Sequence, residues 1–297
     1  MQNNIEIRYA KHIDIVFHAL AYLQVNNASN CYCQKYIDEI AAIKRRFQGC
    51  NHDISHNMNL LQGYYNTNFE RLGLINFLPF YSRNYEELKD IFMNCTQFSA
   101  DDKIYFIEPF IKILNNENEF YFDYWDSLHE KDEPYRKSVE QNLVNEFEKY
   151  SCVFDYYNKS VLIFLSYSMT KNGRGFYGNE GYFGAFAPFP EYGNINAAFF
   201  QLLHELTHTF TDTLLPNINM NDDSHNLSEY MVILADYYLI KAIDKNNILE
   251  YFKWLASGMN RENVELTEEL FLTIFKVDDE IHAKLKRIIN NIFERAL

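Results

Sequence analysis

The sequence predicts an α+β protein that is mainly helical, with a small antiparallel or mixed sheet in its second half. Three observations indicate this class. Apolar residues recur at helical spacing through much of the first half, short apolar runs typical of buried strands follow at 161–165 and 182–187, and helical patterns return from about residue 195. The sequence pattern changes at residue 151, which predicts two regions: a mostly helical one over 1–150 and a second one over 151–297.

Helices in the first region are predicted from apolar periodicity. Their ranges are 8–25, 33–48, 84–95, 101–115 and 133–150. Two of them carry start signals, because Asn84 stands three residues before Glu87 and Pro134 follows two acidic residues. A run of polar and small residues at 26–30 predicts the turn between the first two helices.

The second region begins with a sheet over 160–187. It contains the two predicted strands and, between them, a turn-rich loop at 170–175. A long helix over 195–215 follows, with Asn194 or Asn196 as its cap and Pro216 after its end. A polar loop at 217–225 leads into a helix over 227–243, and two or three more helices complete the chain.

Glycines 173, 175 and 178 match the GxGxxG pattern of dinucleotide-binding loops. That pattern binds phosphate only where the loop opens a helix, because the helix N-terminus supplies the N–H donors. Here the glycines lead into a strand. We therefore interpret the segment as a hairpin loop.

Composition excludes some partners. The formal net charge is −14, so nucleic acid is not an expected partner, because binding it requires Lys and Arg to neutralise phosphates. Apolar runs are too short to cross a bilayer, so no membrane association is expected. The 5 cysteines show no repeated spacing and the first residues do not resemble a signal peptide, which predicts reduced thiols in the cytoplasm.

The main functional motif is His204-Glu205-Leu206-Thr207-His208, an HExxH sequence on the predicted helix 195–215. Residues four apart face the same way on a helix, so both imidazoles can reach one ion. Neutral imidazole suits Zn²⁺, and Glu205 is placed beside the metal as a general base for its water. An incidental pair of solvent-facing histidines is the alternative.

Catalytic zinc needs a third protein ligand and one open position. Glu229, 21 residues after His208, is the best candidate, because the next helix can fold back and present it. Asp222, Asp223 and His225 are rival ligands in the preceding loop. Alternatively, Glu229 completes a capping box at the start of its helix and binds no metal.

The motif and the later glutamate resemble the gluzincin branch of the HExxH metallopeptidases, over residues 160–240. The resemblance implies a zincin-like fold for the second region and an edge strand, containing Gly184 and Ala185, that pairs with an extended peptide. Many gluzincins carry an acidic residue four positions after the third ligand, where this chain has Ile233. Asp236, on nearly the same helix face, is the expected partner of a metal-bound histidine. Metzincins are a poor match, since they need Gly and His at positions 211 and 214.

These features together predict a zinc-dependent hydrolase, most simply a peptidase acting on a peptide or protein. Tyr230 and His225 are the candidates to stabilise the oxyanion on the substrate carbonyl. Two alternatives remain open. One is a zinc amidohydrolase with a non-peptide substrate, and the other is a helical binding or scaffold protein with an incidental motif.

Overall fold

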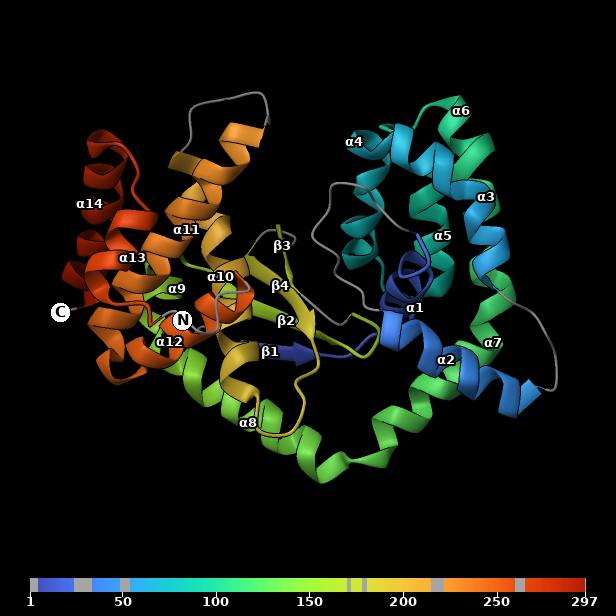
Figure 1. Cartoon of the computed structure of the whole chain (residues 1–297), viewed down its shortest axis with the longest axis horizontal. Helices are drawn as coiled ribbons and strands as arrows, with labels where there is room; N and C mark the ends of the chain where they lie inside the picture. Colours follow the sequence, from blue (N-terminus) through green and yellow to red (C-terminus); the bar gives the residue numbers. More distant parts are fainter. Residues whose placement is uncertain are drawn as a thin grey trace.

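The computed structural model describes residues 5–23, 34–48, 54–169, 172–177, 181–214, 222–259 and 265–296. In this part the chain is mainly helical and contains one four-stranded mixed sheet, which confirms the predicted α+β class. Figure 1 shows the sheet near the centre of the molecule, with the helices of residues 11–131 on one side and those of residues 133–296 on the other.

The sheet has the strand order β1-β2-β4-β3. Strands β1 (Ile5–Arg8), β2 (Ser160–Ser166) and β4 (Tyr182–Pro188) run parallel, and β3 (Arg174–Tyr177) pairs antiparallel with β4. The two predicted strands are confirmed as β2 and β4. Two strands were not predicted: β1 pairs with a strand far along the chain, and β3 begins inside the predicted loop.

One prediction about this sheet is wrong. Gly184 and Ala185 were expected on an edge strand, but β4 is hydrogen-bonded to β2 on one side and to β3 on the other. Its backbone groups are therefore already used within the sheet and are not available to a peptide. Within the described residues, β3 and β1 are the strands at the edges.

The helices of the first half are α1 (Lys11–Leu20), α2 (Gln34–Gln48), α3 (Ile54–Thr67), α4 (Phe69–Leu72), α5 (Tyr85–Asn94), α6 (Ala100–Asp102), α7 (Glu108–Lys131), α8 (Glu133–Lys149) and α9 (Ser151–Tyr157). Two 3₁₀ turns, Gly73–Asn76 and Leu78–Tyr81, follow α4, and a π-helical turn, Lys103–Ile107, precedes α7. Asn84 caps α5 as predicted, because its side chain accepts a hydrogen bond from the Glu87 N–H at 2.9 Å. The turn predicted at 26–30 lies outside the described residues.

The helices of the second half are α10 (Ile195–Thr211), α11 (Asp222–Ile243), α12 (Ile248–Gly258), α13 (Glu268–Ile274) and α14 (Asp279–Ala296). The 3₁₀ turns Asp212–Leu214 and Lys245–Asn247 follow α10 and α11. Two details differ from expectation. Asn194 lies at the N-cap position of α10 without a side-chain capping bond, and α11 begins at residue 222, inside the predicted loop.

A hydrophobic core lies on each face of the sheet. Successive side chains of a strand point to opposite faces, and on β2 Val161 and Ile163 join the core formed by α8–α14, while Leu162 and Phe164 join the core formed by α1–α7. The sheet therefore holds the two groups of helices together, and the boundary near residue 150 stays a prediction. Among the described residues, no helix combines the length and apolar character that crossing a bilayer requires.

Candidate metal centre

Helix α10 carries the HExxH residues and packs against β4 and β3. Its apolar side chains pack into the core shared with β4 and the C-terminal helices; they are Phe199, Leu202, Leu206 and Phe210. A helix turns by about 100° per residue, so this packing directs His204 and His208 away from the core stripe, towards the neighbouring helix α11. The two imidazole centroids are 5.0 Å apart, and their planes are nearly perpendicular, at 89°.

Glu229 of α11 meets both imidazoles. His204 Nε2 lies 3.2 Å from one carboxylate oxygen, and His208 Nε2 lies 3.5 Å from the other. Tetrahedral zinc with bonds of about 2.0–2.1 Å keeps its donor atoms roughly 3.3 Å apart, so these separations match the size of a zinc site. In the described part of the chain, these three residues form the group of potential ligand side chains close enough to hold a cation.

The position of Glu229 in its helix tests the alternative that this residue forms a capping box. A capping box requires Glu229 at the third position of the helix, but α11 begins at Asp222, so Glu229 stands in the second helical turn. The capping-box interpretation is therefore wrong. The backbone of the rival ligands Asp222, Asp223 and His225 belongs to α11, and their side chains lie outside the described part of the structure.

Asp236 contacts the second nitrogen of the first histidine. One Asp236 oxygen is 3.2 Å from His204 Nδ1, and the other accepts a hydrogen bond from the Thr207 hydroxyl at 2.7 Å. The carboxylate is fully buried. Because Nδ1 faces Asp236, Nε2 of His204 is turned towards Glu229, which is the arrangement that second-layer carboxylates impose on metal-binding histidines.

A second carboxylate, which was not predicted, lies next to the other histidine. Asp212, one turn after His208, has an oxygen 3.5 Å from His208 Nδ1. That same oxygen accepts a hydrogen bond from the Ser228 hydroxyl at 2.7 Å. The spacing of four residues between His208 and Asp212 is a sequence signal that could have identified this contact.

The charges in the cluster depend on one another. Burial disfavours the imidazolium forms, but hydrogen bonds to Asp236 and Glu229 outweigh it and raise the pKa of His204 to about 10. For His208, burial is likewise outweighed by hydrogen bonds to Asp212 and Glu229, which raise the pKa to about 9. Burial raises the pKa of Glu229, but the two histidines hold it well below its usual range. Without a cation, the cluster therefore retains protons that a metal would displace.

Glu205 lies beside the cluster, in close contact with β3. Its carboxylate accepts a hydrogen bond from Gln201 Nε2 at 2.7 Å. A Cβ added to Gly173 would lie 2.7 Å from Glu205 Cγ, and one added to Gly175 would lie 2.5 Å from the Glu205 carbonyl oxygen. The two glycines thus allow β3 to approach the helix at the residue between the histidines. Close backbone approach explains them, and Gly178 lies outside the described residues.

The remaining predicted residues lie elsewhere. The Tyr230 ring packs edge-to-face on Phe275, at 5.4 Å between centroids, in the core of the C-terminal helices. Gly184 accommodates the ring of Phe176, which a side chain at position 184 would displace, and Ala185 is buried in the core. An aromatic neighbour of the cluster was not predicted: the Trp254 ring of α12 lies 6.2 Å from the His204 ring.

Comparison of the chain with protein-family models, with curated proteins and with solved structures finds no match in any of the three. A functional assignment therefore depends on the geometry of the cluster. That geometry supplies two imidazole nitrogens and one carboxylate, a group that could hold a metal ion.

Proposed function

We propose that this protein is a zinc-dependent hydrolase and that its substrate is a peptide or protein. The observation that carries the proposal is the convergence of His204 Nε2 and His208 Nε2 on the Glu229 carboxylate, with Glu205 next in sequence to His204. A structural zinc site usually has four protein ligands, most often Cys or His. Three ligands of the type found here favour catalysis.

Each residue of the cluster has a separate role in the proposed hydrolysis. Bound zinc supplies Lewis-acid activation of water and of the substrate carbonyl. His204, His208 and Glu229 hold the ion, and Asp236 and Asp212 orient the two imidazoles. Glu205 takes a proton from the attacking water and delivers it to the leaving amine. Its hydrogen bond from Gln201 fixes the carboxylate for both transfers.

Strand β3 is the surface on which we place the substrate. It lies at the edge of the sheet, next to Glu205, with β4 as its neighbour on the other side. An extended peptide that adds to β3 as a further strand would bring its backbone carbonyls towards the metal helix. This geometry favours a peptide substrate over a compact non-peptide amide, because the amide has no extended backbone that could pair with β3.

The proposed compartment is the cytoplasm. Cys95 and Cys152 are free thiols in the structure, and a reducing environment keeps thiols in that state. Neither lies in the ligand set of the cluster.

The test is turnover by the zinc-loaded protein. Digestion of a denatured protein such as casein, followed by mass spectrometry of the products, should show peptide-bond cleavage. Glu205→Gln should retain zinc and lose activity by about 10²–10⁴-fold, the usual contribution of a general acid–base residue. His56→Ala, which changes an exposed histidine of α3, is the matched control and should leave activity unchanged. Full activity of Glu205→Gln would refute the assigned role. Cleavage of small amides but no peptide would favour an amidohydrolase, and zinc binding without turnover would favour a scaffold.

A further inference from the structure

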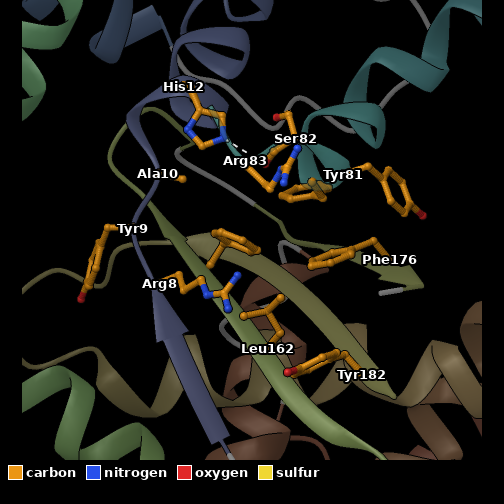
Figure 2. Close-up of a pocket in the computed structure, with 12 residues that line it drawn as sticks. Arg8, Tyr9, Ala10, His12, Tyr81, Ser82, Arg83, Leu162, Phe176 and Tyr182 are labelled. Atoms are coloured by element: carbon orange, nitrogen blue, oxygen red, sulfur yellow. Dashed lines mark hydrogen bonds between the residues drawn. The ribbon is translucent and has the colours of Figure 1, made fainter. Parts of the chain in front are cut away.

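A pocket of about 520 Å³ lies on the face of the sheet opposite the metal cluster. It is lined by the end of β1 and the residues after it, by the segment around Leu78–Tyr81 and by side chains of β2, β3 and β4 (Figure 2). Leu162 and Phe164 face it, whereas Ile163 between them faces the core that contains α10. Its volume is within the range of about 300–1,000 Å³ that small-molecule sites occupy.

The floor of the pocket is flat and apolar. Phe80 stacks on Phe176, with ring centroids 4.4 Å apart and an angle of 7° between planes. The missing side chain of Gly184 makes room for the Phe176 ring over the sheet. Leu162 and Phe164 continue this surface, so a planar or branched apolar group can lie against it.

The rim of the pocket carries basic side chains in an acidic protein. Among the described residues, its lining includes Arg8, Arg83 and His12 but no Asp or Glu, although the chain has 41 acidic residues and a net charge of −14. Figure 2 shows the Arg8 side chain extending across the pocket towards Leu162. A carboxylate outside the pocket holds this guanidinium, because Glu6 accepts from Arg8 Nε at 2.6 Å and from Nη2 at 2.8 Å.

The second arginine is held in a similar way. Glu87 accepts hydrogen bonds from Arg83 Nε and Nη2, at 3.0 and 3.1 Å, while the side chain stays largely exposed. In the Arg8–Glu6 pair, the hydrogen bonds to the carboxylate use Nε and Nη2, so the Nη1 group has donors available for a ligand. His12 Nε2 donates to the Ser82 carbonyl at 3.2 Å, which fixes the ring at the rim.

We propose that this pocket binds a small organic carboxylate with an aromatic or branched apolar body. The body lies on the floor formed by Phe80 and Phe176, and the carboxylate accepts hydrogen bonds from the Arg8 guanidinium. Guanidinium groups match carboxylates in geometry, and a charge-assisted bond in a partly enclosed pocket is stronger than one in water. The pocket is separate from the proposed zinc site, which lies on the other face of the sheet.

The test compares an acid with its neutral analogue. The probes are 4-phenylbutyrate and 4-phenylbutyramide, titrated by calorimetry into the full chain after metal removal and dialysis, because a carboxylate could otherwise bind zinc. The acid should bind about tenfold more tightly than the amide, the difference expected for one charged hydrogen bond. Arg8→Met should remove this preference, and Arg295→Met, on the last helix, should keep it.

Three controls make the outcome decisive. Thermal denaturation of Arg8→Met checks that the variant folds, and Arg83→Met, which changes an exposed side chain, supplies a second variant with a weaker expected effect. His56→Ala, which changes an exposed histidine of α3, should bind the acid as the unchanged chain does. Equal affinity for acid and amide, an unchanged preference in Arg8→Met, or absence of binding at millimolar probe would each overturn the proposal.

Discussion

Replacing Gly175 with alanine adds a methyl group where β3 meets helix α10. The new Cβ would lie 2.5 Å from the Glu205 carbonyl oxygen. The Cβ is attached directly to the backbone of β3 and the oxygen belongs to the backbone of α10, so no flexible side chain can move aside. Relieving this overlap requires a shift of roughly 1 Å between strand and helix. Overpacking of this kind costs about 1–3 kcal/mol, and a misplacement of about 1 Å near the reacting groups reduces turnover by about 10²-fold.

The assay for Gly175→Ala separates stability, metal binding and turnover. Chemical denaturation should show the loss of about 1–3 kcal/mol. Zinc content should stay at that of the unchanged chain, because the three ligands belong to α10 and α11 and not to β3. Peptide turnover, measured well below the unfolding transition, should fall by about 10²-fold.

Gly63→Ala is the matched control for this substitution. Gly63 lies within α3, and a Cβ at that position has no neighbour within 4 Å. Alanine is the better helix former by about 1 kcal/mol, so this variant should be as stable or more stable and fully active. If Gly175→Ala matched Gly63→Ala in both stability and turnover, the close approach of β3 to Glu205 would be refuted.

Three further predictions concern single carboxylates and protons. Asp236→Asn should weaken zinc affinity by about 10–100-fold in a chelator competition, with the fold intact by circular dichroism; unchanged affinity would contradict the role of Asp236 in orienting His204. The metal-free pKa values of His204 and His208 are raised to about 10 and about 9, so both imidazoles carry protons at pH 7. Zinc binding at pH 7 should therefore release close to two protons, and the number released should decline as pH rises through this range. Calorimetry in buffers of different ionisation enthalpy measures the number of protons released, and no release would contradict the raised pKa values. Asp14 is buried and accepts a hydrogen bond from Trp125 Nε1 at 2.7 Å. Asp14→Ala should therefore lower the free energy of unfolding, measured by chemical denaturation, by about 3 kcal/mol. A decrease below about 0.5 kcal/mol would show that the Trp125 N–H finds another partner. Burial raises the pKa of Asp14 to about 6, so its titration favours the folded state below about pH 4 and this contribution is lost as pH rises through about 6.

Much of the candidate metal centre could be predicted because its signals are local. The spacing of His204 and His208 places both on one helix face, and chemistry then requires a third ligand. Glu229 was selected by that requirement and by its distance along the chain. Its competing interpretation as a cap depended on where α11 begins, and helix ends are the least certain part of a sequence prediction.

The sheet was harder to predict, because its pairing is not local. Strand β1 has only four residues, and its partner β2 lies more than 150 residues later in the chain. The sequence near Ile5 therefore carries no local signal of this pairing. Strand β3 contains glycine and follows a turn-rich segment, which favours a loop by local rules. Its glycines reflect the contact with Glu205, which only the folded chain brings about.

The side chains that contact Glu205 and His208 could be predicted from the sequence in part. Gln201 and Asp212 each stand four residues from the side chain that they contact, Glu205 and His208, and this spacing is visible in the sequence. Helical spacing alone does not select them, because many other pairs share it. Tertiary packing determines which of these pairs is buried and forms a contact in the cluster.

Zinc stoichiometry of the purified chain tests the central claim most directly. The metal-stripped protein is titrated with zinc chloride, dialysed, and analysed by inductively coupled plasma mass spectrometry. One equivalent of zinc per chain should be retained, and His204→Ala and Glu229→Ala should each retain little, while His56→Ala retains one. A chain that keeps no zinc, or that keeps it equally well without His204, would contradict the assignment of this cluster as a metal centre.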